Sequence, residues 1–150
     1  MTRSERQFVQ PSAAKLRVLF ICIGNSCRSP MAESIGRRDA ADLFESSSAG
    51  LSPLGVVQKL TLATLKTNGY PTDGLSSKAI LNSDWVNADL VINMSGYSRE
   101  RTFPRGEWHK IEDWNVDDPY GSAPAVYQRI FEDIRIRIEA LAARLRERHP

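Results

Sequence analysis

The sequence predicts a single-domain α/β protein of three layers, in which helices cover both faces of a four-stranded, parallel, twisted sheet. Its 150 residues suit one domain with a sizeable core. Strand-like apolar runs alternate with segments of helical periodicity, which is the order typical of parallel sheets. An apolar content of 41% and a charged content of 25% are those of an ordinary globular protein. In such sheets, ligands bind at the carboxyl ends of the strands.

The predicted elements alternate along the chain. Buried strands are predicted over 18–22 and 88–94, a short strand over 46–50, and a fourth strand within 108–114. Helices are predicted over 31–45, 53–68, 98–102 and 124–146. Ser29 is the candidate N-cap of the first helix, and Gly69 is the candidate C-cap of the second. Residues 1–14 are polar and are predicted to form a flexible tail before a domain that spans 15–150.

The segment 22–33, CIGNSCRSPMAE, joins the first predicted strand to the first helix. Gly24 and Asn25 tolerate a left-handed backbone, so the chain can turn sharply there. A strand, a short loop and a helix N-terminus together form an anion-binding cradle, because successive N–H groups turn inward and the helix dipole adds positive potential. The predicted oxyanion-binding residues are Ile23, Gly24, Asn25, Ser26, Cys27, Arg28 and Ser29.

Cys22 stands at the start of this loop, and Arg28 follows after five intervening residues. A helix N-terminus and an adjacent arginine both favour the thiolate, which is the nucleophilic form of cysteine. The guanidinium can also bind two oxygens of a tetrahedral oxyanion at once. One positive field would thus attract the substrate and activate the sulfur. The alternative is a buried cysteine at a strand end beside an ordinary helix start.

The segment 117–121, DDPYG, carries the second chemical feature. When a thiolate attacks a phosphate ester, an acid is needed to protonate the departing oxygen. Pro119 disfavours a helix at the preceding residue and stiffens the loop that would hold a carboxyl over the cradle. The sequence therefore indicates a catalytic aspartate here, and the alternative is a plain acidic turn.

The segment 22–33 resembles the signature of the low-molecular-weight protein tyrosine phosphatases and of the related phosphatase-like arsenate reductases. Segments 48–50, 87–91 and 117–120 are also similar, and the resemblance extends from about residue 16 to the C-terminus. It implies a phosphatase I-like fold. It further implies that Cys22 is the nucleophile, that Arg28 binds the phosphate, and that Asp118, directly before the proline, is the general acid.

The resemblance also assigns supporting residues. Asn25 is expected to hold the loop in shape, with its side chain bonded to local backbone and to Ser48. Ser29 is expected to donate a hydrogen bond to the Cys22 thiolate, in addition to or instead of capping the helix.

The resemblance also implies which residues form the walls of the slot that receives the substrate. Tyr120 fits one wall, on which a phosphotyrosine ring could stack. Gly121 stands where relatives often carry a second tyrosine, and aliphatic Leu54 or Leu51 stands where they often carry another. The slot is therefore expected to be more open than in typical tyrosine phosphatases, with Tyr120 and Leu54 as its substrate wall.

Other residues look closer to the arsenate reductase branch, among them Ser26 and the run 77–96. Thioredoxin-coupled reductases of that branch use two further cysteines, and Ser95 and Thr102 hold those positions here. An intramolecular thiol relay is therefore absent, and arsenate reduction would need an external thiol such as glutathione or mycothiol. Cys27 is a candidate redox partner of Cys22. Our hypothesis is that a reversible disulfide between the two would protect Cys22 against over-oxidation.

Three functions follow from these residues. The first is a cysteine-dependent phosphatase that hydrolyses phosphomonoesters, above all phosphotyrosine in proteins, through a phosphocysteine intermediate. The second is an arsenate reductase coupled to an external thiol, and the third is an inactive anion-binding regulatory module. The intact Cys22, Arg28 and Asp118 favour an enzyme. The expected ligands are a phosphorylated protein or a small aryl phosphate, and phosphate, sulfate or arsenate.

Composition argues against several other classes. A net charge of +2 is too small to indicate binding to nucleic acid or to a membrane surface. No long apolar run and no signal-peptide pattern are present, so we expect a cytoplasmic protein that is a monomer or a weak dimer. The two cysteines lie in one loop and cannot cross-link the fold. His109 and His149 are isolated, no cluster predicts a metal site, and no cofactor is expected.

Overall fold

Four strands form one sheet in the order β2-β1-β3-β4, and every neighbouring pair is parallel. The computed structural model describes residues 15–148, so the predicted tail (1–14) and His149 lie outside the described residues. The strands are β1 (Leu16–Cys22), β2 (Phe44–Gly50), β3 (Leu90–Asn93) and β4 (Ile111–Asp113). The helices are α3 (Arg28–Asp39), α4 (Lys59–Thr67), α5 (Asn82–Asn87), α6 (Arg99–Thr102), the 3-10 helix η1 (Arg105–Lys110) and α7 (Pro124–Arg148).

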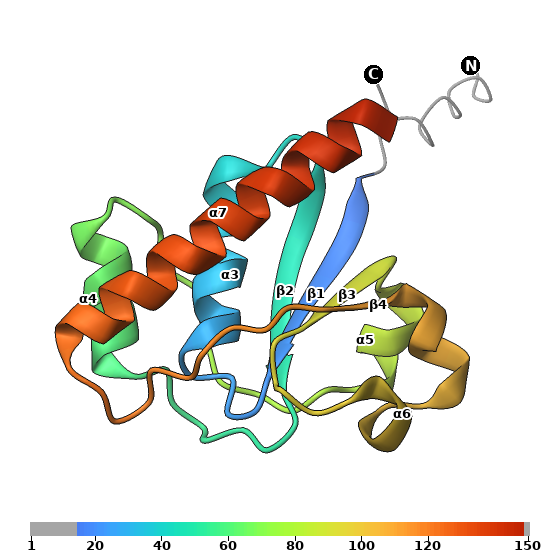
Figure 1. The fold of residues 1–150 in the computed structure, drawn as a ribbon, viewed down its shortest axis with the longest axis horizontal. Helices are drawn as coiled ribbons and strands as arrows, with labels where there is room; N and C mark the ends of the chain where they lie inside the picture. The colour runs from blue at the N-terminus through green and yellow to red at the C-terminus, as the bar shows by residue number, and fades with distance from the viewer. Residues whose placement is uncertain (1–14, 149–150) are drawn as a thin grey trace.

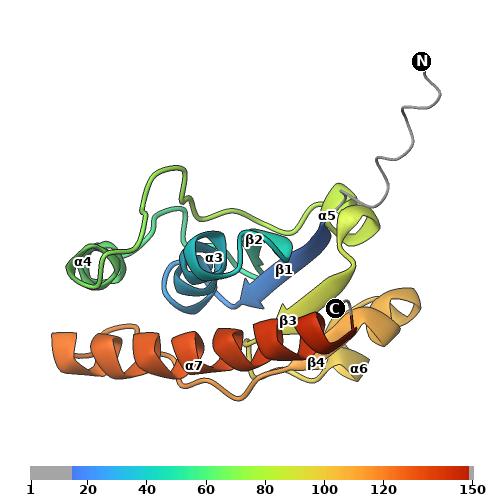
Figure 2. The ribbon, with the colours of Figure 1, turned by 90° about the horizontal axis from the view of Figure 1, so that it is seen from above.

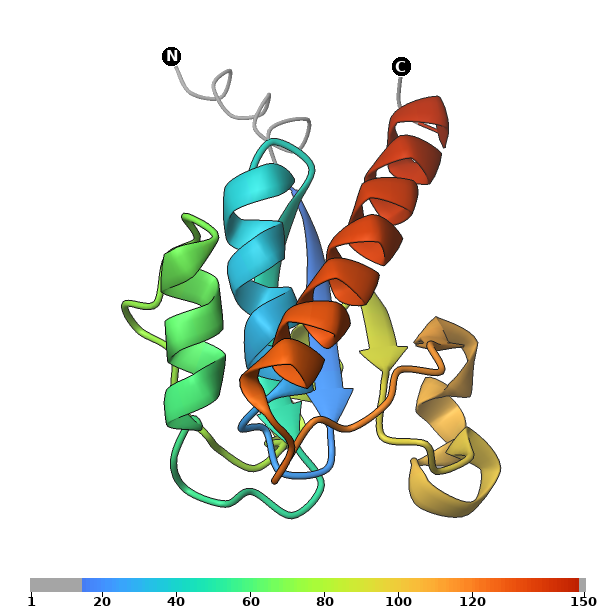
Figure 3. The ribbon, with the colours of Figure 1, turned by 60° about the vertical axis from the view of Figure 1, so that its left-hand side comes forward.

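Helices cover both faces of the sheet, which confirms the predicted three-layer α/β fold. Helices α3, α4 and α7 lie side by side on one face (Figure 3), and α5 lies on the opposite side from α4 (Figure 2). Under α3 and α7, Phe20 packs against Phe44 and Trp114 with ring centroids 6.3 and 6.2 Å apart. On the other face, Leu19, Ile21 and Val91 pack against Phe103. Burial of these apolar side chains is the main stabilising term of the fold.

The parallel arrangement places all four carboxyl ends at one edge. In Figure 1 the strand arrows run toward the lower edge, where the loops that follow β1, β2, β3 and β4 gather. Cys22 of β1 is paired with Gly50 of β2, so the first two of these loops start side by side. Within residues 15–148, none of the helices has the length and hydropathy needed to cross a membrane.

The first helix was predicted with the wrong limits. Helix α3 begins at Arg28 and ends at Asp39, rather than spanning 31–45. Phe44 instead starts β2, because its backbone pairs with Leu16 and its ring is buried beneath the sheet. The predicted N-cap role of Ser29 was also wrong, since the N-cap position is Cys27 and no side chain caps the helix.

The second predicted helix starts later than expected, at Lys59 instead of residue 53. In the preceding stretch, the N–H groups of Leu54 and Gln58 instead bind carbonyl oxygens of the loop after β1. Gly69 does follow the C-cap with a φ of +82°, as predicted. Helix α5 was missed, because its six residues are too few to show a helical period.

Candidate active site

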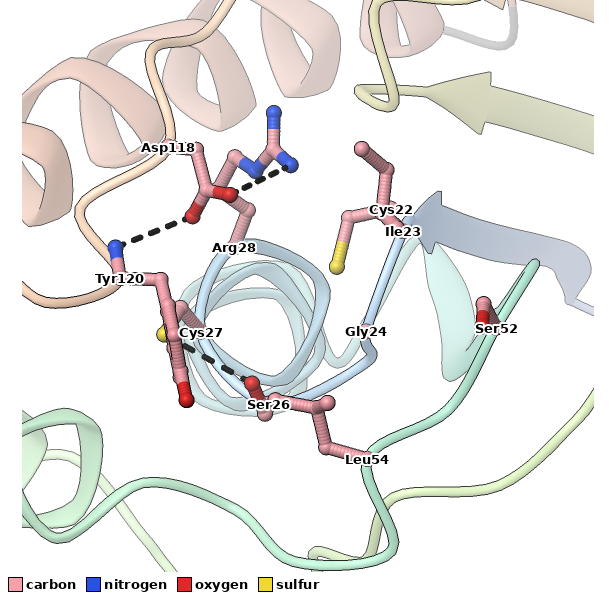
Figure 4. A pocket seen from close by; sticks show the side chains of 10 residues that line it. All are labelled: Cys22, Ile23, Gly24, Ser26, Cys27, Arg28, Ser52, Leu54, Asp118 and Tyr120. Atoms are coloured by element: carbon pink, nitrogen blue, oxygen red, sulfur yellow. Dashed lines mark hydrogen bonds and ion pairs between the residues drawn. The ribbon is translucent and has the colours of Figure 1, made fainter.

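A cavity of about 240 Å³ lies at the carboxyl ends of the strands, between the loop after β1 and the loop that precedes α7 (Figure 4). Figure 4 shows the Cys22 sulfur directed over the start of α3, with Arg28 and Asp118 on one side and Leu54 on another. The lining residues are Cys22, Ile23, Gly24, Ser26, Cys27, Arg28, Ser52, Leu54, Asp118 and Tyr120. The cavity thus collects side chains from segments almost 100 positions apart in the chain.

The loop after β1 is held from outside through its backbone carbonyls. The oxygens of Cys22, Ile23 and Gly24 accept the N–H groups of Leu51, Ser52 and Leu54 at 3.1, 2.8 and 3.0 Å. The oxygen of Ser26 accepts the Gln58 N–H at 3.1 Å and the Thr61 hydroxyl at 2.9 Å. Over the described residues, no N–H group of residues 23–27 donates to a protein acceptor. The amides are therefore left for a ligand, which is what an anion-binding loop requires.

Close approach of the loops explains two special backbone positions. Asn25 has a φ of +48°, so it is Asn25 rather than Gly24 that takes the left-handed conformation. Gly50, at the end of β2, lies directly against the loop. A Cβ atom there would come within 2.8 Å of both the Asn25 Cβ and the Ile23 oxygen. Only glycine lets the second strand end this close to the cradle.

Asn25 is the centre of a buried hydrogen-bond network. Its Oδ1 accepts the N–H of Lys78 at 2.9 Å, which fixes the orientation of the amide. Its Nδ2 therefore donates to the hydroxyl of Ser29 at 2.7 Å and to that of Ser48 at 3.0 Å. All three side chains are fully or almost fully buried. The loop thus carries its support inside the protein, where water does not compete.

Glu33 sets the direction of the protons in this network. Its Oε1 accepts the hydroxyl proton of Ser48 at 2.6 Å, so the Ser48 oxygen is free to accept from Asn25. Ser29 also accepts from Asn25, and its own proton is left for the Cys22 sulfur at 3.0 Å. The Ser29 backbone N–H lies 3.5 Å from the same sulfur. The geometry therefore makes Ser29 a donor to Cys22, which stabilises negative charge on the sulfur.

Arg28 is buried, and it lies on the same side of the Cys22 sulfur as Asp118 (Figure 4). Its Nη1 donates to the carbonyl oxygens of Met94 at 2.7 Å and of Val116 at 3.1 Å, which fixes the plane of the guanidinium. Its buried Nε has no hydrogen-bond partner among residues 15–148. A buried, unpaired cationic donor is costly unless a ligand accepts from it. The edge formed by Nε and Nη2 is therefore suited to two oxygens of a bound oxyanion.

Asp118 and the two predicted wall residues lie at the mouth of the cavity. The Asp118 Oδ2 is 3.5 Å from Arg28 Nη2, and its Oδ1 accepts the Tyr120 N–H at 3.1 Å. Tyr120 and Leu54 are both about half exposed, at 56% and 50%. Leu51, the other residue considered for the wall, packs instead in the core on the α5 side of the sheet. The open mouth leaves room for a ring or side chain attached to the oxyanion.

Cys27 lines the same cavity, but its thiol has separate contacts. Its sulfur lies 3.6 Å from the Tyr127 hydroxyl and 3.8 Å from the Ser26 hydroxyl. Cys22 and Cys27 are both buried, free thiols.

Sequence reasoning missed several residues of the site. Glu33 was expected only to add acidic character at the start of the first helix, and its contact with Ser48 was missed. It is held in turn by Arg37, whose Nη2 lies 2.9 Å from Oε2. Ser52 and Thr61 were not predicted because the Ser52 N–H and the Thr61 hydroxyl bind backbone carbonyls of the loop, and such contacts leave no sequence pattern. Ser95 does not line the cavity, since its hydroxyl donates to Asn93 at 2.6 Å.

Comparison with known proteins identifies the relatives of this site. The model of the family described as low molecular weight phosphotyrosine protein phosphatase matches residues 17–150. The chain belongs to this family. Among curated members, arsenate reductase 1 of Bacillus cereus is 33% identical over 129 residues, which cover 85% of this chain and 95% of the relative.

Solved structures of family members share the fold. The YwlE arginine phosphatase from Geobacillus stearothermophilus matches with a TM-score of 0.79 and 26% identity, over 89% of this chain and 94% of the other. An arsenate reductase in its phosphate-binding state matches with a TM-score of 0.76 and 30% identity, over 87% of this chain and 98% of the other. The family is thus one of enzymes, and its relatives named here are phosphatases and arsenate reductases.

Residues 15–148 contain no group of three or more His, Cys, Asp or Glu side chains placed to hold a metal ion. The groups that face the cavity are one sulfur, one guanidinium, one carboxyl and a set of backbone amides. This set can perform nucleophilic attack on a bound oxyanion and proton transfer to its leaving group.

Proposed function

We propose that the protein is a cysteine-dependent phosphatase that hydrolyses phosphomonoesters, with phosphotyrosine in proteins as its substrate. The observation that carries this proposal is the cavity in which Cys22, Asp118 and Arg28, with its unpaired Nε, face one another. The family match and the relative solved in a phosphate-binding state support the oxyanion as ligand.

The first step transfers the phosphoryl group to sulfur. The Cys22 thiolate attacks phosphorus in line and forms the S–P bond while the bond from phosphorus to the ester oxygen breaks. Arg28 and the free amides of residues 23–27 hold the equatorial oxygens, where charge is concentrated in the transition state. Asp118, in its carboxylic acid form, gives its proton to the departing oxygen. An alcohol or phenol leaves.

The second step restores the enzyme. Asp118, now a carboxylate, accepts a proton from water, and the oxygen of that water attacks phosphorus. The S–P bond breaks, inorganic phosphate is released, and sulfur departs as a thiolate. The Ser29 hydroxyl, 3.0 Å from the sulfur, stabilises the charge that develops on it.

Two features favour an aryl phosphate ester. The Tyr120 ring and the Leu54 side chain flank the mouth of the cavity, and an aromatic ring between them could stack and bury apolar surface. Because both side chains are about half exposed, the slot is open to solvent and has room for a phosphotyrosine that is part of a polypeptide.

The test is to measure hydrolysis of p-nitrophenyl phosphate and of a phosphotyrosine peptide by the purified protein, without added thiol or metal. We expect turnover of both, with one inorganic phosphate released for each p-nitrophenol or each dephosphorylated peptide formed. Phosphate and arsenate should act as competitive inhibitors. The proposal would be contradicted if neither p-nitrophenyl phosphate nor the phosphotyrosine peptide were hydrolysed.

An arsenate reductase that uses an external thiol is the second candidate, and the similarity to the Bacillus cereus reductase favours it. The chain has only two cysteines, and Ser95 and Thr102 stand where the further thiols are expected, so the reductant must come from outside. Arsenate consumption that requires glutathione or mycothiol, in a protein inert toward both phosphate esters, would establish this candidate. Oxyanion binding without either reaction would indicate a regulatory module.

Replacing Ser29 by alanine is expected to slow the second step selectively. The thiolate loses its hydroxyl donor, and a hydrogen bond to a charged group of about 1.5–3 kcal/mol corresponds to a loss of about 10- to 100-fold in kcat. The value of kcat/KM, which reports the first step, should change less. Rapid-mixing kinetics should then show a larger burst of p-nitrophenol than in the wild type. An equal loss in both parameters would mean that Ser29 acts only on loop structure.

A further inference from the structure

A second cavity, of about 420 Å³, adjoins the reaction cavity and has no role in the proposed mechanism. It lies beyond the side on which Tyr120 and Cys27 stand in Figure 4, because Gly121 follows Tyr120 along the chain and lines this second cavity. In the interior, Cys27 lines the first cavity, and its sulfur lies 3.6 Å from the hydroxyl of Tyr127, which lines the second. The two cavities thus share a wall.

The side chains around the second cavity are mainly apolar. Val56 and Val57, from the segment before α4, line it together with Leu60 of α4 and Tyr127 of α7. Val56 is 59% exposed and lies at the rim, whereas Val57 is buried. An apolar group that leaves water and enters this cavity gains free energy. The cavity is therefore suited to an aliphatic side chain of a ligand.

Exposed apolar side chains gather around both cavities. Residues 15–148 expose seven large apolar side chains, and three of them border these cavities: Leu54 and Tyr120 the first, and Val56 the second. A cluster of exposed apolar side chains is typical of a binding surface. A ligand that is longer than one phosphorylated side chain would cover this surface from the first cavity to the second.

Lys59 supplies the charge at this surface. It is exposed, it is the first residue of α4, and among the described residues that line the second cavity it is the only charged one. The positive end of the helix dipole adds to its field. A ligand with a basic group at this place is repelled, because two positive charges would then lie close together.

We propose that the second cavity is a specificity subsite, which receives an apolar side chain of the substrate polypeptide close in sequence to the phosphotyrosine and disfavours a basic one. The inference rests on the proposed function, because it concerns the polypeptide substrate of the same site. Successive residues of an extended chain advance by about 3.3 Å. A residue within three positions of the phosphotyrosine can therefore enter a cavity that shares a wall with the first.

A panel of phosphotyrosine peptides tests the subsite. In peptides otherwise made of glycine and serine, each of the three positions on either side of the phosphotyrosine carries leucine, serine or lysine in turn. At one of these positions we expect kcat/KM to be about tenfold higher with leucine than with serine, the effect of burying one aliphatic side chain, and lowest with lysine. Equal values for leucine and serine at every position, or a preference for lysine, would overturn the proposal.

The variant Val56→Asp assigns the leucine preference to this cavity. Val56 is exposed and does not line the reaction cavity, so its replacement should leave the core and the chemistry intact. The preference should fall below about threefold, while kcat/KM for p-nitrophenyl phosphate, which has no polypeptide, stays within about twofold of the wild type. A leucine preference that is unchanged in this variant would place the apolar contact elsewhere and refute the subsite.

Val86→Asp is the matched control. It makes the same change at a side chain that is 73% exposed, on α5, and outside both cavities. This variant should keep the leucine preference of the wild type. An equal loss of preference in Val56→Asp and Val86→Asp would show that an added surface charge, rather than the cavity, causes the effect, and would also refute the subsite.

A binding measurement separates the subsite from the proposed function. Fluorescein-labelled peptides in which a non-hydrolysable phosphonate replaces the phosphate ester are titrated with wild-type protein, and fluorescence anisotropy gives Kd. The leucine peptide should bind about tenfold more tightly than the serine peptide. If no ester is hydrolysed but this ratio is found and is lost in Val56→Asp, the phosphatase function fails while the subsite stands. Hydrolysis of all peptides with equal Kd values, or no binding of any peptide, would refute the subsite.

Discussion

Replacement of Cys22 by serine is expected to abolish hydrolysis of p-nitrophenyl phosphate, with a loss greater than about 10⁴-fold in kcat. The cradle of amides, Arg28 and Ser29 stabilises a thiolate, but a serine hydroxyl does not ionise in the same surroundings. The measurement is steady-state release of p-nitrophenol, with enough enzyme to detect residual turnover.

The same variant provides its own control for folding. Because the amides of residues 23–27 and the Arg28 edge remain in place, Cys22→Ser should still bind inorganic phosphate, as measured by calorimetry. Retained binding with lost turnover separates the nucleophile from the oxyanion site. Turnover close to that of the wild type would mean that a different group attacks phosphorus.

The variant Asp118→Asn is expected to lower kcat/KM for aryl phosphates by about 10²- to 10⁴-fold, the usual worth of a general acid. Asparagine has nearly the same shape and keeps an acceptor for the Tyr120 N–H, but it has no acidic proton to give. The loss should be larger for phenyl phosphate than for p-nitrophenyl phosphate. Initial rates over a range of substrate concentrations measure it.

The neighbouring aspartate is the matched control for this prediction. Asp117 is exposed and forms an ion pair with Arg129 at 3.6 Å, and it does not line the cavity. Exposed ion pairs of this kind contribute little to stability. Asp117→Asn should therefore retain wild-type kinetics. If the two variants lost activity equally, the general acid would be wrongly assigned.

The layers of the fold were predictable from sequence because β1 and β3 are buried apolar runs that alternate with segments of helical period. The serine-rich β2 is a poor strand by propensity and was predicted only from its position between two helices. The limits of two helices were not predictable. Phe44 has the apolar character of a helix face, but pairing of its backbone with Leu16 makes it part of a strand. Residues 53–58 belong to a segment of helical spacing, yet the N–H groups of Leu54 and Gln58 bind carbonyls of the loop after β1. In both cases a tertiary contact outweighed the local preference.

The side chains that the structure brings together in the cavity were predictable for a different reason. Cys22, Arg28 and Asp118 are chemically distinctive, and the strand, loop and helix around the first two imply their arrangement. The orientation of Ser29 toward sulfur required the amide direction of Asn25 and the carboxylate of Glu33, which spacing alone cannot supply. The contact between Tyr127 and Cys27 joins residues 100 positions apart, and no local pattern indicates it.

The anchoring of the cradle through carbonyl oxygens has an evolutionary consequence. Because the peptide groups of Ile23, Gly24 and Ser26 supply the attachment, the side chains at 23 and 26 line the cavity without holding the loop together. Substitutions at these two positions can reshape the entrance while the nucleophile keeps its surroundings. Diversification from one ester or oxyanion to another would then need few mutations and little loss of stability, which suits a lineage whose members accept different substrates.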